Sequence, residues 1–303
     1  MRRAIIIPVH SPKMNWIVSL INSYLASDTF ASGEDQPRIV LACSDANELR
    51  LISANLLSVV RAKWVELIDV DEYCRLAIGS ERAAQAMRQN ANGAIVNLKK
   101  FVSLHWAARN HIDETILIDV DVMFSHTASF SDIFDHTASA YRSNIVIGTT
   151  LGPEESIYRK ISYASLGLLA VEDQGKLKND GTSEVYTWFS SPPFYPVSDV
   201  TAFFDYMAEV HGDFEGFLLS LTWHTFDNFV FNLYRSAVNG VEIKSYNHLG
   251  FANFAEVLSM TMIDTIEAKL GVKPTWLPFR SVVNDPLLAL KHSHVGLLFH
   301  VDR

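Results

Sequence analysis

The sequence predicts an α/β fold in which a mainly parallel, Rossmann-like sheet is flanked by helices and followed by a helical C-terminal portion. Two observations carry this prediction. Over residues 1–125, short apolar runs rich in β-branched residues alternate with stretches of helical spacing, an order typical of parallel strands joined by right-handed crossovers. Beyond residue 125, helical and aromatic-rich stretches dominate. The prediction rests on the order of elements and not on a glycine-rich fingerprint.

Strands and helices are expected to alternate in residues 1–125. The strands are predicted over apolar runs bounded by turn residues, namely Ala4–Val9, Arg38–Cys43, Val65–Val70 and a run that ends at Asp119. The helices are predicted over Asn15–Leu25, Asp45–Val60, Arg82–Gln89 and Ala94–Arg109. Asp45 with Glu48 three residues later is the pattern of a capping box, which marks a helix start.

The second half is expected to contain fewer strands and longer helices. The predicted strands are Asn144–Thr149, Val185–Phe189, Phe194–Val197 and Val241–Tyr246. The predicted helical segments are Ser129–Phe134, Glu154–Tyr163, Asp199–Val238 and Asn253–Leu270. The polar segment Glu172–Glu184 is predicted to be a loop. For the large apolar groups of Phe203–Met207 and Phe214–Trp223, burial in the core is favoured over docking on a membrane surface.

Composition narrows the class of protein. With 303 residues and 49% hydrophobic content the chain is expected to be globular. Its formal charge of −9 disfavours a nucleic-acid-binding surface. Cys43 and Cys74 are expected to be reduced, buried thiols.

The apolar run near the N-terminus is too short for a signal peptide, so we expect a cytoplasmic protein, with peripheral contact at the inner face of the membrane left open. The oligomeric state also stays open.

The main chemical motif is Asp119-Val120-Asp121 at the end of an apolar run. Two carboxylates one residue apart at the carboxyl end of a parallel strand are hard oxygen ligands for a divalent cation that holds phosphate. A second Ile-Asp-Val-Asp occurs at Ile68–Asp71. We prefer Asp119 and Asp121 because the helix before their strand carries Lys99 and Lys100 as cationic partners for phosphate. Asp69 and Asp71, in contrast, open onto an acidic helix start.

These residues resemble a known family. The segment Lys100-Phe101 through Trp106, followed by Ile116–Val122, is similar to the glycogenin and lipopolysaccharide galactosyltransferase type of GT-A-fold glycosyltransferase. Ile5–His10 resembles GT-A first strands, whose following loop touches the nucleotide. Phe226–Asn232 resembles the family's acidic helix start near the acceptor, and His292–Gly296 resembles its late histidine followed by glycine. The spacing from histidine to glycine differs from the family's pattern, and its trailing Lys-Pro-Trp is missing.

The resemblance implies a metal-dependent glycosyltransferase with a GT-A-like fold. A sugar would pass from a nucleotide-diphosphate donor, with a UDP-sugar as first candidate, to a glycan or lipid-linked acceptor. Residues 1–125 would form the nucleotide-sugar-binding half and residues 126–303 the acceptor-binding half of one domain. The cofactor would be Mn²⁺ or Mg²⁺. The implied metal ligands are Asp119, Asp121 and either His292 or His294. The implied donor-binding residues are Pro8, Val9, His10, Asp45, Lys100 and Asp119. The catalytic residue would be Asp227, which would act on the acceptor hydroxyl as a general base or as an orienting group.

Each of these residues also has a plainer interpretation. Lys100 would snorkel from an amphipathic helix, and His10 would be a turn residue without a role. Asp45 and Asp227 would cap the helices that follow them. The Trp and Phe clusters of the second half, including Trp188, Phe189, Trp223 and Phe226, could stack against a sugar, although most of these rings are expected in the core. Donor base, sugar, acceptor and stereochemistry stay open.

Two other functions compete with the transferase. A haloacid-dehalogenase-like phosphatase also places Asp-x-Asp after an apolar strand, but that motif normally lies near the N-terminus and is followed by Gly or Thr, where Val122-Met123 stands here. The other alternative is a non-catalytic nucleotide- or sugar-binding protein in which the aspartate pair is structural. Loss of donor binding on substitution of Asp121 would separate it from the transferase.

Overall fold

The computed structural model shows three β-sheets among the residues that it describes. The residues that it describes are 1–26, 38–56, 64–91, 95–125, 129–151, 156–187, 192–245, 268–269, 276–278 and 296–299. The central sheet has the strand order β3-β2-β1-β4-β8 and comprises β1 (Arg3–Pro8), β2 (Arg38–Cys43), β3 (Val65–Asp69), β4 (Glu114–Leu117) and β8 (Phe194–Pro196). Its first four strands are parallel, and β8 runs antiparallel to β4. The predicted mainly parallel α/β sheet is therefore confirmed.

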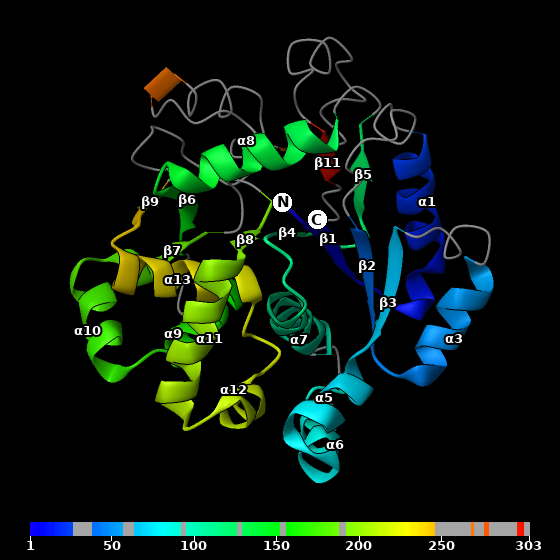
Figure 1. The fold of residues 1–303 in the computed structure, drawn as a ribbon. Coiled ribbons are helices and arrows are strands. Elements are labelled where there is room, and N and C mark those ends of the chain that lie inside the picture. The colour runs from blue at the N-terminus through cyan, green and yellow to red at the C-terminus, as the bar shows by residue number, and fades with distance from the viewer. Residues whose placement is uncertain are drawn as a thin grey trace.

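Helices cover both faces of the central sheet (Figure 1). The helices α1 (Met14–Leu25) and α3 (Ala46–Asn55) lie on one face and α7 (Ile95–Arg109) lies on the other. The helices α5 (Val70–Ile78) and α6 (Ser80–Gln89) follow β3 beyond its carboxyl end. Alternate residues of β1 face two separate cores. Ala4 and Ile6 belong to the core that contains α7, and Ile5 and Ile7 belong to the core that contains α1. Because both faces of the sheet are buried at β1, apolar residues follow one another along this strand without polar residues between them.

The second half builds a helical layer and two small sheets. The helices are α8 (Phe130–Arg142), α9 (Ile157–Leu166), α10 (Val171–Asn179), α11 (Val197–His211), α12 (Phe214–Ser220) and α13 (Asp227–Asn239). One small sheet has the order β7-β6-β9 and contains β7 (Val185–Tyr186), β6 (Ile145–Thr150) and β9 (Glu242–Ser245). The other has the order β10-β11-β5 and contains β10 (Trp276–Pro278), β11 (Leu297–Phe299) and β5 (Val122–Phe124). Short 3-10 turns, η1 (Ser11–Lys13) and η2 (Thr182–Glu184), complete the elements.

The segment predicted as a loop is largely the helix α10. Its composition is polar, but acidic residues occupy its first turn and lysines its last turn, which suits the helix dipole. The Lys176 ammonium lies 2.9 Å from Asp173 Oδ1, and Leu177 is buried in the core. The Tyr206 hydroxyl donates to Asp173 at 2.8 Å. The loop prediction was wrong because one buried leucine and tertiary contacts decide the conformation of a sequence whose composition suggests a loop.

Other boundaries differ in smaller ways. The predicted helix Asp199–Val238 is divided into α11, α12 and α13, with a break at Gly212, whose φ is +90°. The short helical turn predicted from Ser129 extends to Arg142 as α8. The predicted helix Asn253–Leu270 lies outside the described residues except for residues 268–269, which are helical.

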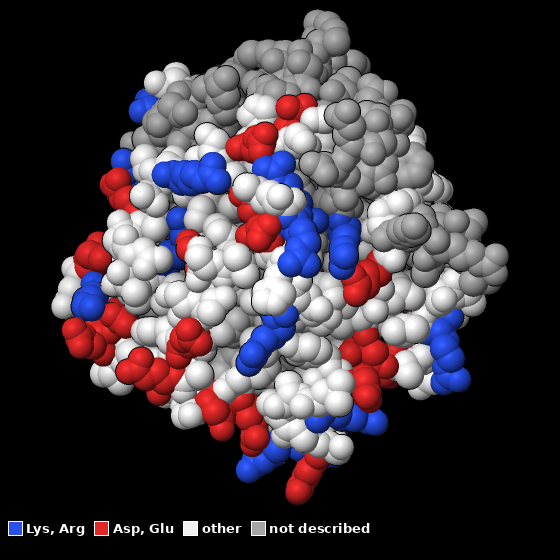
Figure 2. All heavy atoms as spheres, viewed as in Figure 1, with Lys and Arg blue, Asp and Glu red and all other residues white. Residues whose placement is uncertain are grey.

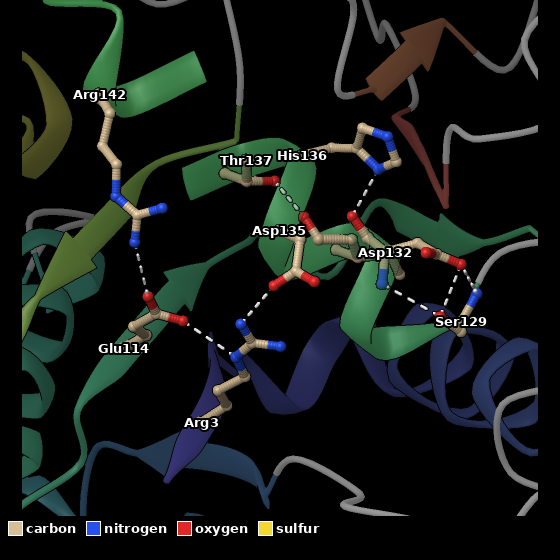
Figure 3. Close-up of polar contacts among 9 residues, drawn as sticks. Arg3, Glu114, Ser129, Asp132, Asp135, His136, Thr137 and Arg142 are labelled. Carbon is tan, nitrogen blue, oxygen red and sulfur yellow. Dashed lines mark hydrogen bonds and ion pairs between the residues drawn. The ribbon is translucent and has the colours of Figure 1, made fainter. Parts of the chain in front are cut away.

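A charged network holds α8 against the amino-terminal ends of β1 and β4 (Figure 3). Arg3 Nε lies 2.9 Å from Glu114 Oε2, and Arg3 Nη2 lies 2.5 Å from Asp135 Oδ1. Arg142, in the last turn of α8, approaches Glu114 Oε1 at 3.5 Å. Ser129 begins the helix with a capping box. This network lies at the amino-terminal ends of the parallel strands, on the side of the sheet away from their carboxyl ends.

Both cysteines and most residues of the aromatic-rich stretch are buried. Cys43 and Cys74 are buried free thiols, as predicted. Phe203, Met207 and Phe217 are core residues, which confirms burial for most of the aromatic-rich stretch. Among the described residues no helix is long and apolar enough to cross a membrane. Acidic and basic side chains are interleaved over the face that Figure 2 shows.

Candidate functional site

The carboxyl ends of β1 and β4 meet where the strand order of the central sheet reverses. Strands β2 and β3 continue on one side of β1, and β4 lies on the other. Open α/β sheets bind ligands at such a reversal. Ile6 pairs with Leu117 in the parallel register. The loop after Val9 therefore lies beside the loop that carries Asp119 and Asp121.

Helix α7 brings two lysines to these strand ends. The helix ends at Arg109, shortly before β4 begins at Glu114, so it runs antiparallel to the strands. Its amino-terminal half accordingly lies near their carboxyl ends. Consecutive helical residues are rotated by roughly 100° about the axis. Lys99 and Lys100 therefore point toward different strand ends.

Lys100 binds two carboxylates from distant parts of the chain. Its ammonium lies 3.0 Å from Asp119 Oδ1 and 3.4 Å from Asp227 Oδ1. The Tyr195 hydroxyl donates to Asp227 Oδ2 at 2.5 Å. The side chains of Lys100 and Asp227 are 7% and 2% exposed, whereas that of Asp119 is 37% exposed. We call these four residues the Lys100 cluster, and Asp119 is its solvent-facing member.

The charges of the Lys100 cluster keep the lysine protonated. Burial by itself would lower the pKa of Lys100, but the attraction of Asp119 and then of Asp227 outweighs burial and raises that pKa above the usual value for lysine. Burial, together with the charge of Asp227, raises the pKa of Tyr195 well above its usual value, so this hydroxyl stays a donor. Lys100 does not snorkel to solvent. The cluster places a fixed positive charge behind an exposed carboxylate.

Asp227 does not cap the helix that it begins. It is the first residue of α13, whose N-cap is Phe226 without a side-chain cap bond. Its two carboxylate oxygens instead contact Lys100 and Tyr195. The plainer interpretation of Asp227 as a cap is therefore wrong, and tertiary contacts to α7 and β8 explain its burial.

Lys99 forms a second buried ion pair beside the Lys100 cluster. Its ammonium lies 2.6 Å from Glu48 Oε2 and also donates to the Val9 carbonyl. Glu48 accepts further hydrogen bonds from the Ser11 amide at 2.8 Å and the Ser44 amide at 2.7 Å. The side chains of Lys99 and Glu48 are 1% and 8% exposed. This pair connects the loops after β1 and β2 to α7, and Lys99 does not face phosphate as the sequence led us to expect.

The remaining donor-binding residues predicted from sequence lie at two strand ends. Pro8 ends β1, Val9 follows it, and both are buried, whereas His10 is the first exposed residue after them. Asp45 is the N-cap of α3, and its side chain accepts from two backbone amides of the first turn at 2.8 and 2.9 Å. The capping role of Asp45 is confirmed. Contact of any of these four residues with a nucleotide stays a prediction.

The second Ile-Asp-Val-Asp copy is engaged in a helix start. Asp69 ends β3 and caps α5 by accepting from a backbone amide of its first turn at 3.0 Å. Asp71 pairs with Arg75 one turn later at 2.5 Å. Asp119, in contrast, lies in a loop between two strands and contacts Lys100. The two motifs have the same sequence but different surroundings. The acidic residues after Asp69 predicted the helix start that the structure shows there.

The carboxylates that suit a cation are those of Asp119 and Asp121, which are both half-buried in one loop. One or two carboxylates completed by phosphate oxygens and water form the usual ligand set of Mg²⁺ beside a substrate phosphate, so this donor set fits such an ion. Among the described residues no group of three or more His, Cys, Asp or Glu side chains is placed to hold a metal ion. The predicted ligands His292 and His294 lie outside the described residues.

Sequence reasoning missed two residues of this region. Tyr195 was seen only as part of a strand, and Glu48 only as the acidic partner in a capping box. Glu48 instead reaches past the cap to Ser44, Ser11 and Lys99. The only local signal was a pair of lysines in a helix that is otherwise buried, which requires carboxylate partners elsewhere.

Comparison with solved structures finds remote likenesses. No family model matches the sequence, and no curated protein matches it. Mouse xyloside xylosyltransferase 1, in its apo form, is similar with a TM-score of 0.47 and 9% identity over 98% of this chain and 97% of that chain. Core-mannan synthase A from Aspergillus fumigatus, in a Mn/GDP form, is similar with a TM-score of 0.38 and 12% identity over 81% of this chain and 73% of that chain. Neither likeness bears on the residues of the site.

Proposed function

We propose that this protein is a metal-dependent glycosyltransferase that moves a sugar from a nucleotide-diphosphate sugar to a glycan or lipid-linked acceptor. The observation that carries the proposal is the Lys100 cluster, where a buried ammonium and a half-buried carboxylate lie at the reversal of strand order. The resemblance of Lys100-Phe101 and Ile116–Val122 to the glycogenin and lipopolysaccharide galactosyltransferase type supports the same reaction and a GT-A-like fold.

The proposed reaction exchanges one bond at the anomeric carbon of the donor sugar. An acceptor hydroxyl oxygen bonds to this carbon, and the bond from the carbon to the phosphate oxygen breaks. The electron pair stays with the departing nucleoside diphosphate, and the hydroxyl proton passes to a phosphate oxygen or a nearby carboxylate. A bound divalent cation would supply Lewis-acid neutralisation of the new charge. Lys100 would add a positive charge beside the departing phosphate. Because Asp119 and Asp227 already hold its ammonium group in place, the lysine need not move during the reaction.

We propose the ligands of the cation and of the donor from the sequence motifs and the strand ends that carry them. Asp119 and Asp121 would hold the cation, with His292 or His294 as an imidazole ligand that favours Mn²⁺ over Mg²⁺. The loop after β1, from Pro8 to His10, would contact the nucleotide, for which we propose a UDP-sugar. Residues 1–125 would hold the donor and residues 126–303 the acceptor.

We propose an orienting role for Asp227. A general base must reach the proton that it removes, and the side chain of Asp227 is 2% exposed with contacts to Lys100 and Tyr195. Asp227 would therefore act through Lys100 by fixing the position of the ammonium. In this proposal Asp227 acts on the donor phosphates through Lys100, and not on the acceptor hydroxyl as the sequence led us to expect.

A thermal-shift experiment tests the proposal. The melting temperature of the full chain is measured with a panel of nucleoside diphosphates and nucleotide sugars, with and without Mn²⁺, for the wild type, Asp121→Ala and Asp71→Ala. Asp71→Ala is the matched control because it alters the same motif at the end of β3. Ligand that binds only the native state raises the melting temperature. We expect one nucleotide to raise it in the presence of Mn²⁺ for the wild type and Asp71→Ala, and not for Asp121→Ala.

Other outcomes would favour the competing functions. A nucleotide shift that survives in Asp121→Ala would favour a non-catalytic binding protein. No shift with any nucleotide, together with release of phosphate from a generic phosphomonoester, would favour a phosphatase. Either result would overturn the proposed transferase.

A further inference from the structure

We infer that Trp223 is the stacking platform for a sugar ring of the acceptor at the rim of the Lys100 cluster. The inference rests on the proposed function and deepens it by assigning an acceptor subsite. Trp223 lies in the connection between α12 and α13 and is 40% exposed. The aromatic rings around this connection behave differently, because those of Phe217, Phe229 and Phe231 are buried in the core. An indole left at the surface beside a buried aromatic core is the feature to explain.

The connection that carries Trp223 is internally braced. The Thr222 amide donates to Thr225 Oγ1 at 2.8 Å, and this hydroxyl donates to the Thr222 carbonyl at 2.7 Å. The His224 amide donates to Thr222 Oγ1 at 3.2 Å, and Thr225 is 1% exposed. The rings of His224 and Phe226 stand nearly perpendicular to the indole, at 85° and 84°. The indole is therefore presented by a structured loop, which lowers the conformational entropy lost when a ligand binds.

Helix α7 places this loop relative to the Lys100 cluster. Asn97 Nδ2 donates to the Trp223 carbonyl at 3.0 Å and the Thr222 carbonyl at 3.3 Å. Asn97 lies three residues before Lys100, on the same side of the helix. Both ends of the segment from Thr222 to Asp227 are thus attached to one face of α7, and Figure 1 shows the connection passing beside this helix.

The direction of α7 decides on which side of the cluster Trp223 lies. Because α7 runs antiparallel to the parallel strands, residues nearer its start lie farther beyond their carboxyl ends. Three residues correspond to about 4.5 Å along the helix axis. Asn97, and with it the backbone of Trp223, is therefore displaced outward from Lys100 and Asp119. In this proposal the half-exposed Trp223 lies beyond the strand ends, on the solvent side of the Lys100 cluster, where an acceptor would meet the bound donor.

The chemistry of an exposed indole suits a pyranose ring. One face of a pyranose carries C–H groups, which pack against a flat apolar ring, while the hydroxyls remain at its edge. Trp offers a large, rigid contact area and an N–H donor at the edge of the ring. The donor nucleotide is a poorer occupant, since Trp223 belongs to the second half of the chain and lies outward of the strand ends. The structure thus assigns the acceptor glycan to Trp223.

The test follows the indole N–H resonances of the full chain by two-dimensional NMR. The resonance of Trp223 is assigned by its loss in Trp223→Phe. Methyl glycosides of glucose, galactose, mannose and xylose are titrated in turn, with and without nucleoside diphosphate and Mn²⁺. We expect at least one glycoside to move the Trp223 resonance in a saturable manner. No saturable movement of this resonance with any glycoside would overturn the inference.

Variants make the test quantitative. Trp223→Ala should weaken binding of the active glycoside at least tenfold, and Trp223→Phe should retain part of it, because the phenyl ring still offers a flat apolar face. Tyr163→Ala is the control, since Tyr163 is also an exposed ring, on α9, and is 49% exposed. A loss in Tyr163→Ala equal to that in Trp223→Ala would contradict the assignment. Melting temperatures of all three variants establish that they are folded.

The outcome is separable from that of the proposed function. If nucleotides raise the melting temperature but no glycoside moves the Trp223 resonance, the acceptor assignment fails and the transferase stands. If a glycoside moves it but no nucleotide binds, the transferase fails and Trp223 marks a sugar-binding protein.

Discussion

Lys99 and Lys100 are neighbours in α7, yet their ammonium groups bind carboxylates in different parts of the site. Lys99 Nζ lies 2.6 Å from Glu48, and Lys100 Nζ lies 3.0 Å from Asp119. Adjacent residues of a helix point in different directions. Lys99 therefore reaches the carboxylate that follows β2, and Lys100 reaches the carboxylate that follows β4. The two ion pairs hold the loops after β1, β2 and β4 to the same buried helix. Their removal should therefore affect stability, with consequences that differ between the two pairs.

Replacing Lys100 should destabilise the fold strongly. Lys100→Met leaves the buried carboxylate of Asp227 without its cation, and breaking a buried ion pair from one side typically costs about 3–5 kcal/mol. We expect a loss of that order in the free energy of unfolding, measured by urea denaturation at neutral pH. The double variant Lys100→Met/Asp227→Asn should lose less than the sum of the single variants, because the uncompensated charge is then absent. Strictly additive losses would contradict the pairing of these two residues.

Glu48 should stabilise the protein in a pH-dependent way. Burial opposes ionisation, but Lys99 and the amides of Ser44 and Ser11 outweigh it and lower the pKa of Glu48. A lowered folded-state pKa means that the unfolded chain binds more protons, so stability rises with pH. The contribution is complete above the ordinary carboxyl pKa of 4.5 and is lost as the pH falls through the folded-state pKa.

The corresponding experiment compares Glu48→Gln with the wild type. At neutral pH we expect Glu48→Gln to lose about 3–5 kcal/mol of unfolding free energy, and the difference should shrink as the pH is lowered below 4.5. Glu66→Gln is the matched control, because Glu66 forms an exposed pair with Arg38 at 3.3 Å, and such pairs contribute roughly 0–1 kcal/mol. Equal losses in the two variants would show that burial of the Glu48 pair is unimportant.

His105 should make the protein sensitive to mild acid. Burial, with a smaller effect of Arg109, lowers the pKa of His105 to about 4, and its ring stacks on Phe214 with 3.9 Å between centroids. The unfolded chain therefore binds one more proton between about pH 6.5 and 4, so stability is complete above 6.5 and falls as the pH decreases through this window.

At pH 5 the loss attributable to His105 should be on the order of 1–2 kcal/mol, after allowance for its partial exposure. His105→Phe removes the titrating group and should flatten the decline of unfolding free energy between pH 7 and pH 5. The measurement is the urea midpoint at both pH values. A decline in His105→Phe as steep as that of the wild type would place the acid sensitivity elsewhere.

Two glycine substitutions should act in opposite directions. In Gly148→Ala the added Cβ would lie 2.3 Å from the Tyr186 carbonyl oxygen and 2.7 Å from Val185 Cγ1, so overpacking should cost about 1–3 kcal/mol. In Gly175→Ala the Cβ meets no atom within 4 Å, and alanine in a helix should stabilise by about 0.5–1 kcal/mol. Thermal denaturation measures both. Absence of any gain in Gly175→Ala would argue against the helix α10.

Much of the first half could be predicted because its signals are local. The apolar runs of β1, β2 and β3 and the capping residue Asp45 are visible in short stretches of sequence, and their structure agrees closely with that expectation. The helix start after Asp69 could also be predicted from local signals, because the acidic residues Asp71 and Glu72 follow it and lie in the first turn of α5. α10 could not be predicted in the same way. Its polar composition suggests a loop, and burial of Leu177 with the contact of Tyr206 to Asp173 decides otherwise.

The sequence by itself determined the alternation of strands and helices and the position of two carboxylates after an apolar run, because periodicity and strand-end chemistry operate over a few residues. Only the tertiary structure decided that Lys100 meets Asp227, that Tyr195 joins them, and that Lys99 pairs with Glu48 instead of facing phosphate. These partners are separated by 51 residues in one case and by more than 100 in another. Their pairing depends on the order of strands in the sheet and on the direction of α7, and neither is encoded in any single stretch of the chain.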